Sequence, residues 1–283
     1  MKLYDVASLW VGPELTWMEQ MCLLSFVDKG HRTILYVYDD VKSVPDGVEV
    51  RDANEIMPSD QIIYHAATGS PAFHSDIFRL RMLDQTDYLW IDTDAYCWQP
   101  FVRPAHGHFY GWGTDETRKI YSGVLGLPKD SPTLQAMLEL TKDEYPVPPF
   151  LPQRQQRRLQ SQKDAGDGVH ISLMRWGVCG PDALHYFLHQ SGEVKHAFDG
   201  PVLYPVPFNS TRSFHRPKLK KGVFDLITEE TLSVHFYGRR FRNIFALTDG
   251  IPMAGSFADD LCQKHGLDPS LTGHLFVRRK KNG

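Results

Sequence analysis

The chain has 283 residues, of which 42% are hydrophobic and 23% are charged, and its formal net charge at pH 7 is −3. These fractions are close to those of globular proteins, which excludes a largely disordered chain. The balanced charge excludes a dedicated duplex-DNA binder, since such proteins carry a basic excess, and we expect no nucleic-acid partner. The length allows about one or two domains.

The cysteines, the N-terminus and the hydropathy together predict a cytoplasmic protein. The four cysteines are far apart and form no Cys-x-x-Cys pair, which argues against a zinc ribbon or a disulfide scaffold. The N-terminal residues lack the apolar segment of a signal peptide. No apolar run approaches the roughly 20 residues that span a bilayer. The basic run at 278–281 predicts either solvated surface or peripheral contact with the inner membrane face.

The first part of the chain alternates between strand and helix patterns. Residues 6–11 predict a buried strand that ends at Gly12-Pro13. Apolar residues at helical spacing over 15–26 predict a helix closed by Gly30. Two further strands are predicted at 33–38 and 48–50. This alternation indicates an α/β fold with a parallel sheet, in which ligands bind beyond the carboxyl ends of the strands.

The next segment places two aspartates at the end of a strand. A helix capped by Ser75 or Asp76 is predicted to run to about Leu83, and a strand over 88–91 leads directly into Asp92-Thr93-Asp94. Carboxylates at this edge of a sheet suit Mg²⁺ or Mn²⁺, which prefer oxygen ligands. The alternative is that both aspartates cap a turn.

The second half contains fewer clear elements. We expect helices at 132–145, 181–190 and 256–265 and a strand at 232–237. A proline-rich break over 146–152 and a Gln/Arg-rich stretch to 168 predict a mobile loop or an excursion over the active face.

The segment 75–96 carries a longer pattern, Ser-Asp-x-x-Arg followed by a strand and Asp-x-Asp. It resembles the DXD-motif sugar-nucleotide glycosyltransferases. The family concerned contains yeast α-mannosyltransferases, α-1,4-N-acetylglucosaminyl- and galactosyltransferases and bacterial capsular polysaccharide synthesis proteins, and shares its core with the large clostridial glucosylating toxins. The resemblance extends to residues 9–12, 30–39, 180–181 and 234–235.

The resemblance implies a GT-A fold, a Rossmann-like α/β architecture with a mostly parallel central sheet and helices on both faces. It also implies a single domain over 1–283. Residues 1–101 would form the nucleotide-sugar-binding half, 102–250 the acceptor-side half, and 251–283 a C-terminal helix and basic tail.

The resemblance implies a metal site for Mn²⁺ or Mg²⁺. Asp94 corresponds to the direct ligand, and Asp92 to its partner, which reaches the donor ribose or the metal through water. His235 corresponds to a late histidine that serves as a further ligand in some such enzymes. The alternative for His235 is a hydrogen-bonded core histidine.

The resemblance also implies catalytic and donor-binding roles. Asp76 would hold donor-sugar hydroxyls and Arg79 the sugar or phosphate, the alternative being a helix cap with a surface salt bridge. Trp10 would lie near the nucleotide base or else in the core. Arg239 would bind the diphosphate or face solvent. Asp182, the third predicted catalytic residue, would face the acceptor or donor sugar or else cap a helix.

The function implied is a metal-dependent, retaining glycosyltransferase in bacterial surface polysaccharide synthesis, with a UDP-sugar favoured over GDP-mannose and a glycan or lipid-linked acceptor. One alternative is a sugar-nucleotide binder without turnover. Another is a haloacid-dehalogenase-type phosphatase with Asp92 as nucleophile, although that pair normally follows the first strand. The remaining histidine pairs are expected to be core or surface residues: His106 with His108, and His185 with His189.

Overall fold

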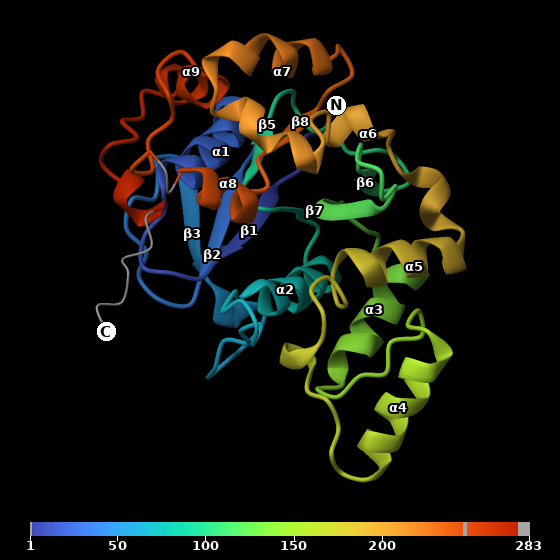
Figure 1. Ribbon diagram of the computed structural model, residues 1–283. Coiled ribbons are helices and arrows are strands. Elements are labelled where there is room, and N and C mark those ends of the chain that lie inside the picture. Colours follow the sequence, from blue (N-terminus) through green and yellow to red (C-terminus); the bar gives the residue numbers. More distant parts are fainter. Residues whose placement is uncertain (1, 246–247, 277–283) are drawn as a thin grey trace, which may run out of the picture.

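A computed structural model describes residues 2–245 and 248–276 of the chain. Its centre is a six-stranded sheet of order β3-β2-β1-β4-β7-β6 (Figure 1). Strands β1 to β4 run parallel to one another, and β7 is antiparallel to both of its neighbours. The bounds are β1 Val6–Trp10, β2 Thr33–Val37, β3 Val48–Asp52, β4 Leu89–Ile91, β6 Phe109–Trp112 and β7 Ile120–Gly126. The predicted α/β fold with a mostly parallel sheet is therefore confirmed.

A second, two-stranded sheet pairs β5 with β8 in antiparallel fashion, at Ala95–Cys97 and Ser233–His235. The α-helices are α1 Trp17–Asp28, α2 Ala72–Gln85, α3 Pro132–Lys142, α4 Gln153–Asp164, α5 Pro181–Ser191, α6 Gly200–Leu203, α7 Lys220–Leu226, α8 Gly238–Phe245 and α9 Phe257–Lys264. Short 3-10 helices are η1 Ala53–Glu55, η2 Ile171–Leu173, η3 Glu193–His196, η4 Phe208–Phe214, η5 Pro217–Leu219 and η6 Gly273–Phe276.

Helices cover both faces of the central sheet, as expected. Alternate residues of β1 enter different cores: Ala7 and Leu9 pack with α2, α3 and α5, whereas Val6 packs with α1. Figure 1 shows α2, α3 and α5 on the opposite side of the sheet from α1. The sheet is thus buried on both faces, which is typical of parallel sheets.

A third core joins the C-terminal part of the chain to α1. Met18 and Met21 of α1 pack there with aromatic residues of α8 and α9, among them Phe241 and Phe257. Helix α1 is consequently buried on most of its surface, which explains its apolar residues outside a single stripe. This packing places β8 beside β5, and β5 is the strand that directly follows the two aspartates in the sequence.

The carboxyl ends of β1 and β4 form the point at which the strand order reverses. Strand β1 lies between β2, which follows it in the chain, and β4, which the chain reaches only after β3 and α2. In open α/β sheets, ligands bind in the crevice at such a switch point. Trp10 ends β1 at this crevice, and Asp92 follows β4 there.

Two local predictions were wrong. Helix α2 begins at Ala72 after Pro71, so neither Ser75 nor Asp76 caps it. Asp76 lies inside the helix, where its side chain reaches Arg79 one turn later. The stretch expected to be a mobile loop contains α4, in which Leu159 alone is buried. Its Gln, Arg and Lys residues favour helix although the segment has almost no apolar stripe.

The predicted basic run at 278–281 lies outside the described residues. All four cysteines are buried and free. No helix among the described residues has the length and apolar character needed to cross a membrane.

Candidate active site

Asp92 and Asp94 lie in the turn between β4 and β5, and their backbones are fixed from two directions. The N–H of Asp92 donates to the carbonyl of Gly123 in β7 at 2.6 Å, and the N–H of Phe236 donates to the carbonyl of Asp94 at 2.9 Å. The Oδ1 of Asp92 accepts a hydrogen bond from Nε1 of Trp90 at 2.7 Å. The two carboxylates are therefore held at the sheet edge.

His235 joins these aspartates through the small sheet. In the β5–β8 pairing it lies opposite Ala95, the residue after Asp94. Its Nε2 is 3.4 Å from Oδ1 of Asp94, and its buried Nδ1 has no hydrogen-bond partner among the described residues. One potential ligand atom from each of Asp92, Asp94 and His235 lies within 4.8 Å of the others. Two carboxylates and an imidazole form a donor set that suits a divalent metal ion.

Arg79 of α2 connects Asp92 to its surroundings. Its Nη1 donates to the carbonyl of Ser122 at 2.8 Å, and its Nη2 donates to Oδ1 of Asp92 at 3.1 Å. The same Nη2 lies 3.3 Å from Oδ1 of Asp76. The guanidinium is 4.9 Å from the ring centroid of Trp90, at cation–π distance. Arg79 is thus a buried connector between α2, β4 and β7.

The charges at this site are not balanced by the protein. Within the described residues, Arg79 is the one lysine or arginine that contacts Asp76, Asp92 or Asp94. Burial raises the pKa of Asp76 to about 6, an effect that Arg79 opposes and Asp92 reinforces. Burial also raises the pKa of Asp92, despite Arg79. Three carboxylates with one guanidinium leave about two negative charges, which a divalent cation fits.

Gly123 allows the close packing of the site. This glycine was not among the predicted site residues. A Cβ at this position would lie 2.6 Å from Cε1 of His235 and 3.2 Å from Oδ2 of Asp92. Any larger residue would therefore displace the proposed ligands. A glycine inside a strand pattern often marks such a close approach, so the pattern at 120–126 contained the necessary signal.

Two other glycines contact the remaining carboxylates. The N–H of Gly238, at the start of α8, donates to Oδ2 of Asp94 at 2.5 Å. A Cβ at Gly180, just before α5, would lie 2.6 Å from Oδ2 of Asp76. Gly180 therefore covers Asp76, whose exposed fraction is 7%.

Trp10 lies at the crevice next to Arg242, which is paired with Glu19. The guanidinium of Arg242 is 5.9 Å from the ring centroid of Trp10 and forms an ion pair of 2.6 Å with buried Glu19. Burial raises the pKa of Glu19, while Arg242 and Thr16 oppose this rise. The indole Nε1 of Trp10 is buried without a hydrogen-bond partner in the described part of the chain. Trp10 is half-buried, so its ring is neither fully enclosed in the core nor fully exposed for contact with a nucleotide base.

The structure does not bring Arg239 or Asp182 to the carboxylates. Exposed Arg239 lies over the ring of Trp176, with 4.4 Å between guanidinium and ring centroid. Asp182, in the first turn of α5, forms ion pairs with Lys119 at 2.5 Å and Arg175 at 2.8 Å. Asp182, Lys119 and Arg175 line a cleft of about 430 Å³ together with Phe150, His185, Tyr186 and His189.

Comparison with known proteins finds distant likeness to solved structures. No model of a known protein family and no curated protein matches this sequence. Among matching solved structures, the PaToxG glycosyltransferase is 14% identical with a TM-score of 0.45, over 68% of this chain and 71% of that chain. The apo structure of the bifunctional glycosyltransferase WbbM is 9% identical with a TM-score of 0.47, over 98% of this chain. The chain spans about half of WbbM, 52% of its length.

Proposed function

We propose that this protein is a metal-dependent glycosyltransferase that moves a sugar from a nucleotide-sugar donor to a glycan or lipid-linked acceptor. The observation that carries the proposal is the meeting of Asp92, Asp94 and His235 at the switch point of the sheet. Nucleotides bind at such switch points, and divalent cations bridge carboxylates to diphosphates. The resemblance of segment 75–96 supports the donor class.

Asp92, Asp94 and His235 would hold Mn²⁺ or Mg²⁺. When bound, the ion would neutralise the diphosphate and stabilise charge on the leaving group. Half-buried Trp10, across the crevice at the end of β1, offers a ring face for the nucleotide base. The donor would thus lie between the ends of β1 and β4.

Arg79 and Asp76 would act mainly on the geometry of this site. Both terminal nitrogens of Arg79 already bond protein oxygens, so its proposed role is to orient Asp92 rather than to bind phosphate. Asp76 holds Arg79 in place and would meet a donor hydroxyl through the small part of its surface that remains exposed. The cleft beside Asp182 would receive the acceptor.

The finer assignments depend on the sequence resemblance. It favours UDP as the nucleotide, retention at the anomeric carbon and a role in bacterial surface polysaccharide synthesis at the inner membrane face. It also supports the division into a donor half over 1–101, an acceptor half over 102–250 and a C-terminal part over 251–283. Arg239 would bind the diphosphate only after leaving Trp176.

A thermal-shift panel of UDP- and GDP-sugars, each with Mn²⁺ or with EDTA, tests the proposal. A ligand at 100 times its dissociation constant stabilises the folded state by about 2.7 kcal/mol. We expect one donor to raise the unfolding temperature in Mn²⁺ alone, and release of its nucleoside diphosphate to follow. Stabilisation without release would indicate a non-catalytic binder. No stabilisation by any donor at saturating concentration would contradict the proposal.

A further inference from the structure

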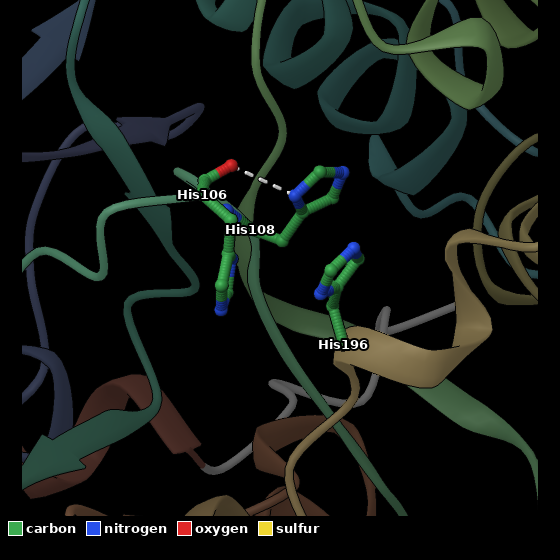
Figure 2. Close-up of side chains that lie close together, drawn as sticks. All are labelled: His106, His108 and His196. Carbon is green, nitrogen blue, oxygen red and sulfur yellow. Dashed lines mark hydrogen bonds between the residues drawn. The ribbon is translucent and has the colours of Figure 1, made fainter.

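Three histidines gather next to the start of β6, outside the proposed donor site. His106 and His108 lie in the turn that leads into β6, and His196 ends η3 after α5. Figure 2 shows the ring of His196 beside that of His108. The ring centroid of His196 is 4.4 Å from that of His108 and 4.5 Å from that of His106. One nitrogen from each residue lies within 4.8 Å of the others.

A buried carboxylate orients one of these histidines. Glu193 Oε1 is 2.8 Å from Nε2 of His108, while its Oε2 accepts hydrogen bonds from Ser131 Oγ and Thr133 N, each at 3.0 Å. A carboxylate oxygen accepts hydrogen bonds, so the N–H at Nε2 of His108 donates a hydrogen bond to Oε1 of Glu193. Histidines that bind metals commonly donate their second ring N–H to a carboxylate in this way.

The other nitrogen of His108 faces an oxygen. Nδ1 lies 2.9 Å from the backbone carbonyl of His106, the contact drawn as a dashed line in Figure 2. A bare lone pair at that distance from a carbonyl oxygen would be repelled, so Nδ1 needs a positive partner. A metal ion about 2.0–2.1 Å from Nδ1 would be such a partner, and the carbonyl of His106 would turn away to make room for it.

The two remaining rings have nitrogens to offer. His106 is exposed; its Nδ1 accepts from the backbone N–H of His108 at 3.1 Å, which leaves its Nε2. His196 is partly exposed, and neither of its ring nitrogens has a hydrogen-bond partner among residues 2–245 and 248–276. Zn–N bonds are about 2.0–2.1 Å, so the nitrogens must converge from their present separation. The exposed rings of His106 and His196 can do so by rotation.

We propose that His106, His108 and His196 bind one zinc-class transition metal ion, with Glu193 orienting His108. Imidazole nitrogens suit Zn²⁺, Cu²⁺ and Ni²⁺, whereas the carboxylates at Asp92 and Asp94 favour harder ions. Three protein ligands leave a fourth position for water. The ion would link the turn before β6 to η3, two segments that are far apart in the sequence.

The proposal is tested by titrating chelator-treated full-length protein with Zn²⁺, and with Co²⁺ followed by visible absorption. Both titrations use the Asp94→Asn background, which weakens the competing site. We expect one Zn²⁺ per chain and a tetrahedral Co²⁺ spectrum. His106→Gln and His196→Gln should each weaken Zn²⁺ binding at least tenfold, since even residues behind the ligands change affinity by about 10–100-fold.

The double variant His185→Gln/His189→Gln is the matched control, because it removes another close histidine pair, whose ring centroids are 4.6 Å apart. It should leave Zn²⁺ affinity within about twofold of the background, compared with the tenfold losses above. Absence of binding would overturn the proposal, as would equal affinity in His196→Gln and the background. None of these readouts depends on glycosyl transfer, so the result stands apart from the fate of the proposed function.

Discussion

Arg79 and Asp92 are joined by a hydrogen bond of 3.1 Å from Nη2 to Oδ1, and no other arginine or lysine of the described chain contacts the carboxylates of Asp76, Asp92 and Asp94. Because Nη1 of the same guanidinium donates to the carbonyl of Ser122, the contact fixes α2, β4 and β7 relative to one another. The carboxylate proposed to hold the metal is thereby oriented before any ligand arrives.

Replacing Arg79 with lysine should damage the site although the charge is kept. A single ammonium cannot reproduce the planar contacts to Ser122 and Asp92 at the same time. We expect kcat/KM to fall about 10–100-fold and the free energy of unfolding to fall by about 1–3 kcal/mol. Urea unfolding and donor-turnover kinetics measure the two effects.

Arg81→Lys is the matched control for this change, since Arg81 lies on the same helix and is partly exposed. Its free energy of unfolding should stay within about 0.5 kcal/mol of the wild type. If Arg79→Lys behaved in the same way, the connecting role of Arg79 would be wrong.

Gly123→Ala should weaken metal binding without touching a charged group. The added methyl would lie 2.6 Å from Cε1 of His235, and the strand can relieve this contact only by moving β7 or the histidine. We expect a loss of about 1–3 kcal/mol in stability and a weaker Mn²⁺ affinity, measured by calorimetry. Gly222→Ala in α7, where a Cβ meets nothing within 4 Å, should keep full affinity and stability. Unchanged Mn²⁺ affinity in Gly123→Ala would remove this glycine from the site.

Asp76 should make stability depend on pH in a defined direction. Its pKa is about 6 in the folded protein, above the ordinary value of 3.8, so the folded state binds the proton more tightly. The resulting stabilisation is complete below about pH 4 and is lost as the pH rises through 6. The Asp76→Asn variant has no carboxyl group at this position, so its free energy of unfolding does not fall in this way as the pH rises. Its free energy of unfolding relative to the wild type should therefore increase by about 2–3 kcal/mol between pH 4 and pH 7.

The measurement is urea unfolding in EDTA at several pH values, with Asp84→Asn, on the exposed side of the same helix, as the control for removing a carboxylate. The pH slope is the readout, because replacing the neutral carboxyl of Asp76 with an amide changes the free energy of unfolding by an amount that does not vary with pH, whereas the effect of Arg79 on the ionised carboxylate is already contained in the pKa. A difference between variant and wild type that stays flat from pH 4 to pH 7 would refute the assignment.

Much of the fold could be predicted because its first half consists of short, regular units. Strands β1, β2 and β4 are mainly apolar runs, and β3 follows a glycine and alternates valine with charged residues; the structure has strands at all four predicted positions. The missed elements lack such signals. Strand β5 is one of these, with three residues that directly follow the two aspartates. Strand β8 lies within the strand predicted at 232–237, but its pairing with β5 depends on the third core rather than on local pattern.

The site was predictable only in part, for a physical reason. Asp92 and Asp94 are neighbours in the sequence, and a strand end places them together whatever the rest of the chain does. Their contacts with Gly123 and Gly238 instead depend on which strands and helices meet in space. The same holds for the Glu193–His108 pair, whose members are 85 positions apart.

Direct Mn²⁺ binding, followed by electron paramagnetic resonance of the free ion with and without UDP, tests the central claim. The wild type should bind one Mn²⁺ per chain, and more tightly with UDP. Asp94→Asn, whose amide oxygen can still accept from the N–H of Gly238, should fold normally and bind at least about tenfold more weakly. Asp87→Asn, just before the other end of β4, should bind as the wild type does. Equal Mn²⁺ affinity in Asp94→Asn and the wild type would contradict a metal site at the end of β4.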